Sequence, residues 1–256
     1  MGRQSGFLRH RADDPRCGIL PLRSGTGGKK CPHTAGVYRV WHRGYSFLIN
    51  GHLHHPARMN MVNFLIPVLG YLAGSLPFSV WVTRRVKGVD VRDAGSGHAT
   101  TTNTIRQAGF GWGALVLTLD IAKGFIPTWL ALELSGETWV IALTAACAVI
   151  GHCWPLFAQF RGGMGLATFG GALLAVNWFA FVIGLGLLLF LTLVIHHGAR
   201  ASVMTGILIA PVFWLFNLRG LELWIAVAGG LVIAYRFLID WNRKYRELWL
   251  DREKKQ

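Results

Sequence analysis

Two glycine-containing segments carry residues that could bind a phosphate group. In the first, Gly95, Ser96 and Gly97 can form turns that aim several backbone N–H groups at one point, the geometry of an anion nest. Short hydrogen-bonding side chains and an arginine suited to bidentate phosphate binding follow: Thr100, Thr101, Thr102, Asn103 and Arg106. An ordinary polar connection is the alternative, but the cluster as a whole favours an anion site.

The second segment reads QFRGGMGLAT, residues 159–168. Arg161 is followed by Gly162, Gly163 and Gly165, so a cation again lies beside backbone amides. An apolar stretch follows, and the N-terminal end of a helix attracts anions. A tight turn whose glycines permit close helix packing explains the same residues equally well. Met164, in the middle of the segment, can neither donate a hydrogen bond nor carry a charge.

Three ionisable residues fall within apolar stretches. Asp120 and Lys123 have the i, i+3 spacing of a pair on one helix face. Charges inside a membrane mark either a functional interior or a pair that neutralises itself. A lone histidine such as His152 is more typical of a hydrogen-bonded structural residue than of a base. The four cysteines show no CxxC spacing, and we expect no metal site.

The composition places these segments in a membrane protein. Of the 256 residues, 52% are hydrophobic and only 15% charged, with a mean hydropathy of +0.40. At about 20 residues per crossing, the hydropathy predicts an all-α fold of about seven transmembrane helices. The stretch 165–195 is too long for one crossing, and we divide it at Asn177. The expected spans are 62–83, 112–134, 138–158, a short helix from 165 to 177, a helix from 177 to 195, 202–217 and 221–239, with a polar loop at 84–111.

The positive charges predict the orientation, because cytoplasmic loops accumulate Lys and Arg. With seven crossings, the other side of the membrane collects only Arg219. The first side collects fourteen: Arg84, Arg85, Lys87, Arg92, Arg106, Arg161, Arg200, Arg236, Arg243, Lys244, Arg246, Arg252, Lys254 and Lys255. We therefore expect an external start of the first helix, a cytoplasmic C-terminus, and both glycine segments on the cytoplasmic face.

The chain divides into three expected parts. Residues 1–60 contain ten Lys/Arg against two Asp/Glu and lack the apolar region of a signal peptide. We interpret them as a basic extension that is disordered or lies upstream of the true start; nucleic-acid binding is the sharper alternative, but no nucleic-acid partner is expected. Residues 61–240 form the membrane domain, and 241–256 form a charged cytoplasmic tail.

Taken together, the polar segments resemble the bacterial acyl-phosphate:glycerol-3-phosphate acyltransferases, the PlsY family. The matching elements occur in the family's order over about 61–245: GYLAGSLPFS (70–79), KGVDVRDAGSGHATTTNTIRQAG (87–109), LDIAKGFIP (119–127), GHCWPLFAQFRGGMGLAT (151–168) and AYR (234–236). The resemblance implies a seven-helix protein of the bacterial inner membrane with an external N-terminus. It also implies transfer of the acyl group of an acyl phosphate to the 1-hydroxyl of sn-glycerol 3-phosphate, giving lysophosphatidate and phosphate in phospholipid biosynthesis.

The resemblance further implies roles for individual residues. The expected catalytic residues are Ser96, Asn103, Arg106, His152 and Ser202. The expected substrate-binding residues are Gly95, Gly97, Thr101, Thr102, Arg161, Gly162, Gly163, Gly165 and Arg236. Catalysis would come from positioning and from stabilisation of developing charge, without a covalent enzyme intermediate, a metal or CoA. The expected partners are the two substrates and membrane lipids, with an acyl-phosphate-producing enzyme as a further candidate.

The sequence departs from the family pattern at several positions. Met164 replaces a lysine, and His98 replaces an asparagine in the first segment. The family's His, Arg and Glu after Arg236 are replaced by the apolar run 237–239, and its serine-bearing loop is reduced to GARAS, which leaves Ser202. A catalytically degenerate paralog that binds lipid or phosphate is therefore the alternative function. A transporter with glycine-interrupted helices is a weaker one.

Overall fold

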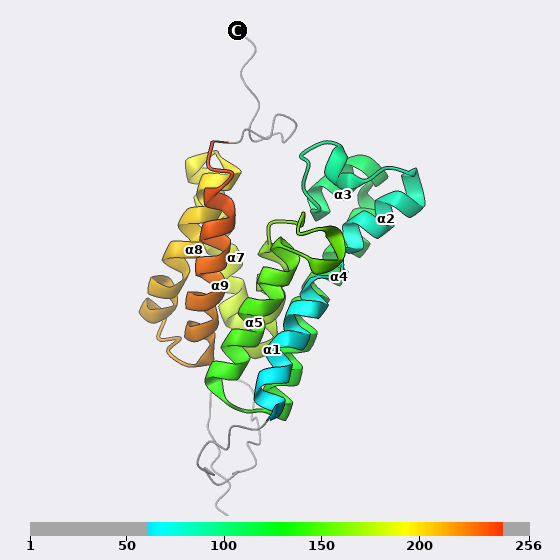
Figure 1. Cartoon of the computed structure of the whole chain (residues 1–256). Helices are drawn as coiled ribbons and strands as arrows, with labels where there is room; N and C mark the ends of the chain where they lie inside the picture. The colour runs from blue at the N-terminus through cyan, green and yellow to red at the C-terminus, as the bar shows by residue number, and fades with distance from the viewer. Residues whose placement is uncertain (1–60, 243–256) are drawn as a thin grey trace, which may run out of the picture. The chain divides into compact units, whose positions relative to one another are not determined.

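The computed structural model describes residues 61–242, and this part of the chain consists of helices and connecting turns without a strand (Figure 1). The helices are α1 (Met61–Gly74), α2 (Phe78–Lys87), α3 (Thr101–Ala108), α4 (Phe110–Leu134), α5 (Thr138–Cys153), α6 (Leu166–Val176), α7 (Trp178–Ile195), α8 (Gly198–Leu215) and α9 (Leu221–Leu238), with 3-10 turns at Val91–Asp93 and Leu156–Ala158. The all-α class is confirmed. The expected basic extension and most of the expected tail lie outside the described residues.

Six segments between residues 61 and 242 are long and apolar enough to cross a membrane. The first, Met61–Lys87, joins α1 to α2; the others are built on α4, α5, α7, α8 and α9. The remaining apolar helix, α6, has 11 residues. At 1.5 Å per residue it is roughly 16 Å long, about half the thickness of the hydrocarbon core. These six segments and α6 correspond to the predicted set of about seven helices.

The division of the long apolar stretch at Asn177 is confirmed. α6 ends at Val176 and α7 begins at Trp178, with Asn177 extended between them at φ −156° and ψ 109°. The side-chain oxygen of Asn177 accepts hydrogen bonds from the backbone N–H groups of Phe179 at 3.0 Å and Ala180 at 3.4 Å. Asn177 therefore caps α7 and satisfies donors that would otherwise be unpaired at the start of an apolar helix.

Two parts of the predicted topology differ from the structure. The span expected at 62–83 is interrupted after Gly74, and α2 begins only at Phe78. Pro77 explains the break, because a proline lacks an N–H and disfavours helical backbone at the residue before it. The polar loop expected at 84–111 contains the end of α2 and all of α3, whose cap Thr100 accepts a hydrogen bond from the N–H of Asn103 at 3.3 Å.

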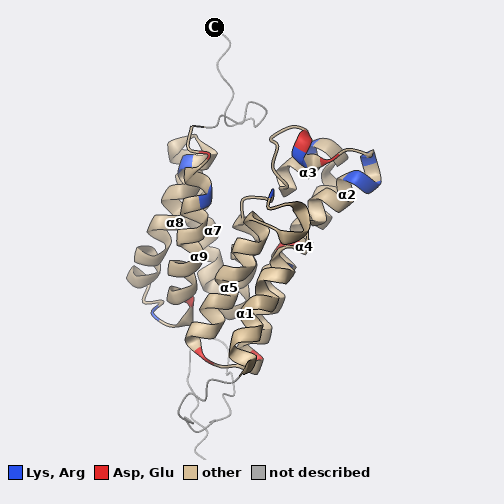
Figure 2. Ribbon diagram, viewed as in Figure 1, with Lys and Arg blue, Asp and Glu red and all other residues tan. Residues whose placement is uncertain are grey.

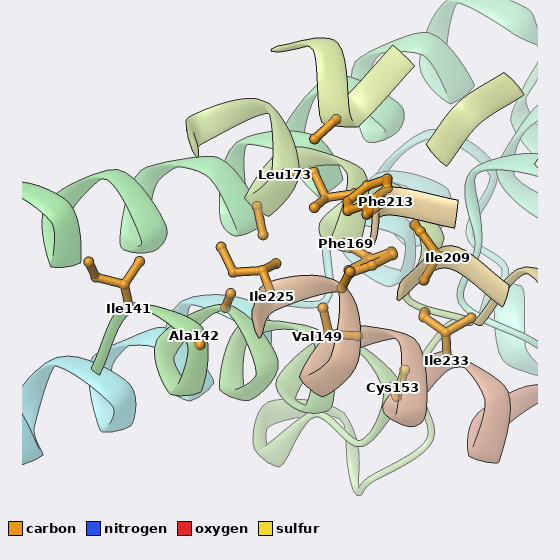
Figure 3. Close-up of a cluster of buried hydrophobic side chains, with 14 of the residues drawn as sticks. Ile141, Ala142, Val149, Cys153, Phe169, Leu173, Ile209, Phe213, Ile225 and Ile233 are labelled. Atoms are coloured by element: carbon orange, nitrogen blue, oxygen red, sulfur yellow. The ribbon is translucent and has the colours of Figure 1, made fainter. Parts of the chain in front are cut away.

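Glycines allow the central helices to approach closely. α1 packs against α5, α4 against α6, and α8 against α9. A Cβ on Gly74 of α1 would overlap the carbonyl oxygen of Ala148 in α5, and a Cβ on Gly171 of α6 would overlap the carbonyl oxygen of Ile121 in α4. In lipid the hydrophobic effect does not draw helices together, so they associate through close van der Waals packing. Small residues at the crossings permit that packing. The larger apolar side chains of α5, α6, α8 and α9 then fill the interior (Figure 3).

The exterior of the helices is apolar, and apart from the buried pair Asp120 and Lys123 in α4 the described charges lie near the helix ends. Leu189, Phe190 and Leu193 of α7 are 55%, 61% and 64% exposed, as expected for a helix that contacts lipid. Lys and Arg gather on α2, on α3 and at the C-terminal end of α9 (Figure 2). Most of the described basic side chains therefore lie in segments that the predicted topology places on the cytoplasmic side.

Substitution of Gly74 by alanine tests the close contact between α1 and α5. We expect Gly74→Ala to lower the free energy of unfolding by about 1–3 kcal/mol, because the new Cβ meets the α5 backbone. Gly186→Ala in α7 is the matched control, since no atom lies within 4 Å of a Cβ there. The control should be neutral or stabilising by up to about 1 kcal/mol, because alanine favours helix. Thermal unfolding in detergent measures both, and equal melting temperatures for the two variants would contradict the contact.

Candidate functional site

Asn103 holds the Gly95–Gly97 turn in place. Its side chain is fully buried, and its amide nitrogen donates to the carbonyl oxygens of Val91, Ala94 and His98 at 2.8, 2.9 and 3.1 Å. Its amide oxygen lies 3.4 Å from the N–H of Ser96. Gly95 and Gly97 have φ values of +59° and +70°, and a Cβ on Gly95 would overlap the Asn103 amide. Asn103, expected to be catalytic, thus supports the backbone of the turn.

The start of α3 adds donors beside this turn. Thr101 and Thr102 occupy its first positions, where backbone N–H groups have no partner within the helix. Arg106 follows about one turn later, and its Nη2 is buried without a hydrogen-bond partner among the described residues. A helix N-terminus and an unpaired guanidinium group together give this loop the capacity to bind an anion.

Arg92, which sequence reasoning did not select, joins the first loop to the second glycine segment. Its guanidinium contacts the Asp90 carboxylate through Nη2 at 2.7 Å and donates through Nη1 to the carbonyl oxygen of Ala158 at 2.7 Å. Arg161 completes the junction by donating to the carbonyl oxygen of Arg92 at 3.2 Å and to Asp93 at 3.1 Å. The Arg92 guanidinium, with help from Arg84, holds the pKa of Asp90 well below its usual value. Asp90 in turn raises the pKa of Arg92.

The glycine turn, residues 161–165, packs tightly against Ala99 of the first loop and against His152 of α5. The carbonyl oxygen of Gly162 accepts from the N–H of Ala99 at 3.3 Å, and the N–H of Gly163 donates to the carbonyl oxygen of His152 at 3.1 Å. A Cβ on Gly163 would overlap the His152 ring. Close packing therefore explains Gly162 and Gly163, and the Gly163 amide is already engaged.

The end of the same segment belongs to the apolar core. Gly165 has a φ of +83° and caps α6, where a Cβ would crowd Cys153 and Ile233. Met164 is 7% exposed and belongs to the main apolar cluster. Position 164 thus contributes packing to the segment and supplies no charge.

Arg236 connects α9 to the glycine turn and to the first loop. It is 8% exposed, and its Nε donates to the carbonyl oxygen of Gly163 at 3.2 Å. Its Nη1 lies 3.3 Å from the Asp240 carboxylate, and its Nη2 lies 3.2 Å from Nδ1 of His98. A guanidinium group can only donate, so Nδ1 of His98 accepts and its Nε2 donates to Asp240 at 3.0 Å. His98 and Asp240 were not predicted as site residues, because the contact that joins them links positions far apart in the sequence.

Asp120, Lys123 and His152 form a buried polar group behind the glycine turn. The predicted pair is confirmed: Nζ of Lys123 lies 2.9 Å from Oδ1 of Asp120 and donates to the carbonyl oxygen of Leu76 at 3.1 Å. His152 lies 3.7 Å from the same carboxylate oxygen, and its Nδ1 makes no hydrogen bond within the described part of the chain. Lys123, His152, Ala99, Gly162 and Gly163 line a cavity of about 10 Å³, enough for about one water molecule.

An apolar groove of about 580 Å³ runs between α1 and α4 and ends at this polar group. Of the described residues that line it, only Lys123 is charged. Leu76 and Lys123 line both the groove and the small cavity. The other residues that line the groove are Leu69, Leu72, Ala73, Phe78, Leu119, Ala122, Ile126, Pro127, Leu130 and Phe157. The groove and the small cavity therefore lie on either side of a common wall formed by Leu76 and Lys123.

Ser202 lies in the first turns of α8, which begins at Gly198, four residues before the start expected at 202. The Ser202 hydroxyl donates to the carbonyl oxygen of Gly198 at 2.9 Å. Within residues 61–242, no hydrogen bond joins Ser202 to the first loop, the glycine turn or Arg236. The structure thus brings the Gly95–Gly97 turn, Arg161, Gly162, Gly163 and Arg236 together without Ser202.

The Asp90 contacts predict a pH-dependent contribution to stability. Asp90→Asn should lower the free energy of unfolding at pH 7 by about 1–2 kcal/mol, because charge-assisted hydrogen bonds to Arg92 are lost. The folded pKa of Asp90 lies below its unfolded value of about 3.9, so this stabilisation is complete above that pH and declines below it. Melting temperatures of both proteins should therefore converge as the pH falls from 5 toward 3. A difference that stays constant or grows would contradict the assignment, and the exposed Asp93→Asn, worth less than about 1 kcal/mol, is the control.

Known proteins provide an independent comparison. A sequence profile described as "Glycerol-3-phosphate acyltransferase" matches residues 64–247. "Glycerol-3-phosphate acyltransferase 2" of Thermotoga maritima is 42% identical over 115 residues, which are 45% of this chain and 59% of that protein. The match thus spans only about three fifths of that relative's length. The glycerol-3-phosphate acyltransferase of Aquifex aeolicus is 35% identical over 185 residues, 70% of this chain and 93% of the relative.

A solved structure agrees with the sequence matches. The crystal structure of PlsY (YgiH), an integral membrane glycerol 3-phosphate acyltransferase in its glycerol 3-phosphate form, superposes with a TM-score of 0.63 at 32% identity. The superposition covers 71% of this chain and 91% of that one. Sequence profile, curated relatives and fold agree, and the chain belongs to the glycerol-3-phosphate acyltransferase (PlsY) family of integral membrane proteins.

Proposed function

We propose that this protein transfers the acyl group of an acyl phosphate to sn-glycerol 3-phosphate and so makes lysophosphatidate and inorganic phosphate. The observation that carries the proposal is that an apolar groove lies next to a polar cavity, with Lys123 lining both. Such a site suits a substrate that has both an alkyl chain and a phosphate. The family relative has been solved in both a glycerol 3-phosphate form and a lysophosphatidic acid form, which supports the same substrate class.

The reaction requires a phosphate site, a nucleophile and a proton acceptor. The 1-hydroxyl of glycerol 3-phosphate attacks the acyl carbonyl carbon, a C–O ester bond forms, and the bond to the phosphate oxygen breaks. The hydroxyl proton passes to a base, and the phosphate leaves with the electron pair of the broken bond. His152 is positioned to accept this proton, because it lines the cavity and its Nε2 is the ring nitrogen that lies against Gly163, while its Nδ1 lies 3.7 Å from the Asp120 carboxylate.

The remaining predicted residues divide between binding and support. The first turn of α3 and Arg106 supply donors for one phosphate. Arg161 can join them, because its ion pair with Asp93 is solvent-exposed and such pairs contribute little. Asn103, Gly162, Gly163 and Arg236 act by holding the segments together, since their polar groups bind other parts of the chain.

The proposed site faces the cytoplasm of a bacterial cell. The gathering of Lys and Arg at this end of the helices supports that orientation (Figure 2). Glycerol 3-phosphate then reaches the site from water, and the acyl chain reaches the groove from the bilayer. The product carries an alkyl chain and leaves to the membrane.

An assay with the purified full chain tests the proposal. We supply palmitoyl phosphate and labelled glycerol 3-phosphate, and expect lysophosphatidate with one phosphate released per ester formed. Palmitoyl-CoA is supplied in parallel. Product from the thioester alone would contradict the proposed donor. No product from either donor, from a protein that still shows a cooperative thermal unfolding transition, would overturn the proposed acyltransferase activity.

Arg106→Gln should lower kcat/KM by about 10²–10³, as loss of a transition-state donor does. Arg219→Gln, in the turn before α9, should leave it unchanged.

A protein that binds these ligands without chemistry is the second candidate. Met164 and Phe237 favour it, because both occupy the apolar core at 7% and 5% exposure, where the family pattern has polar residues. The assay above separates the candidates when it is combined with a binding measurement. Saturable binding of glycerol 3-phosphate without turnover would identify the non-catalytic protein.

A further inference from the structure

Lys123 occupies an unusual position for a charged residue in a membrane helix. It lies in the middle of α4 and is 6% exposed. Its ammonium group contacts Asp120 and the carbonyl oxygen of Leu76, and it lies 5.6 Å from the centroid of the Phe78 ring. The same residue lines the apolar groove and the cavity beside the glycine turn. Among the described residues, the cation that lines the groove is thus also part of the wall of the polar cavity.

The ammonium group retains capacity for a ligand. A lysine has three N–H donors, and the hydrogen bonds to Asp120 and Leu76 use two of them. The third N–H group is left with the cation–π contact to the Phe78 ring. A hydrogen bond to an anionic oxygen would be stronger than this contact. A pair with only a structural role needs no contact with a groove, and ionisable groups that line a cavity in a membrane protein mark a ligand path.

Position 164 supplies no cation beside the cavity. Met164 is buried, and its side chain packs in the apolar cluster. Lys123 of α4 lines the cavity together with Gly162 and Gly163. Among the described residues that line this cavity, Lys123 is the one with a fixed positive charge.

We propose that Lys123 is the head-group recognition residue for the lipid substrate. It binds the ionised phosphate of a single-chain amphiphile whose alkyl chain lies in the groove between α1 and α4, and it discriminates against uncharged single-chain lipids. This assignment rests on the proposed function, but it concerns binding and is tested without turnover. Asp120 is a positioning residue that fixes the ammonium group through a buried contact.

The test is a binding measurement on the full-length protein with dodecyl phosphate, which cannot donate an acyl group. Lys123→Met should weaken its dissociation constant at least tenfold. Binding of dodecyl glycerol ether, which is uncharged, and of glycerol 3-phosphate should change less than twofold. Lys87→Met removes the same charge from the exposed end of α2 and should leave all three constants unchanged.

A double variant distinguishes the loss of a binding contact from misfolding caused by an unpaired buried charge. Lys123→Met leaves Asp120 buried without its partner, so Asp120→Asn/Lys123→Met removes both charges together. We expect the double variant to lose dodecyl phosphate binding as Lys123→Met does, whereas Asp120→Asn alone keeps it within about threefold. Dodecyl phosphate bound equally well by the double variant and the parent would overturn the assignment.

The outcomes also separate this inference from the proposed function. If the parent makes no lysophosphatidate but the Lys123 variants still lose dodecyl phosphate, the reaction is wrong and the recognition site stands. If the parent is active and the Lys123 variants bind dodecyl phosphate normally, the reaction stands and this inference fails.

Discussion

The site depends on buried side chains that donate hydrogen bonds to main-chain carbonyl groups of other segments. Arg92 binds the carbonyl oxygen of Ala158, Asn103 binds that of Val91, and Arg236 binds that of Gly163. Two irregular segments that lie at the end of an apolar bundle carry backbone polar groups that need partners when they are buried. These three side chains satisfy them, and in doing so they fix the first loop, the glycine turn and the end of α9 as one unit.

This arrangement gives Gly162 and Gly163 a packing role in place of the expected role in substrate binding. Gly162 and Gly163 allow the turn to lie directly against Ala99 and His152, where any Cβ would collide with the neighbouring chain. These glycines thus permit close contact, and in the proposed site the start of α3, Arg106 and Lys123 are the donors for an anion. Met164 fits the same account, because the turn needs an apolar residue to attach it to the core. A charge lost at position 164 is compatible with a site whose cations come from α3 and α4.

Local patterns in the sequence predicted much of the fold. The apolar runs and the break at Asn177 could be read directly, since an asparagine between two hydrophobic stretches can cap the second one. The pair formed by Asp120 and Lys123 followed from helical spacing. The interruption after Gly74 was missed because the apolar run continues through Leu76 and Phe78 and hides the effect of Pro77. α3 was missed because six of its eight residues are polar and resemble a loop.

The contacts that assemble the site could not be predicted from such patterns. His98 and Arg236 are 138 residues apart, and Arg92 and Ala158 are 66 apart, so only the packed helices bring them together. The most direct test of the assembled site is hydrogen–deuterium exchange with and without glycerol 3-phosphate. The account predicts that the ligand protects amides of 94–106 and of 158–165 together. Protection of neither segment, or protection confined to the opposite end around 218–220, would contradict it.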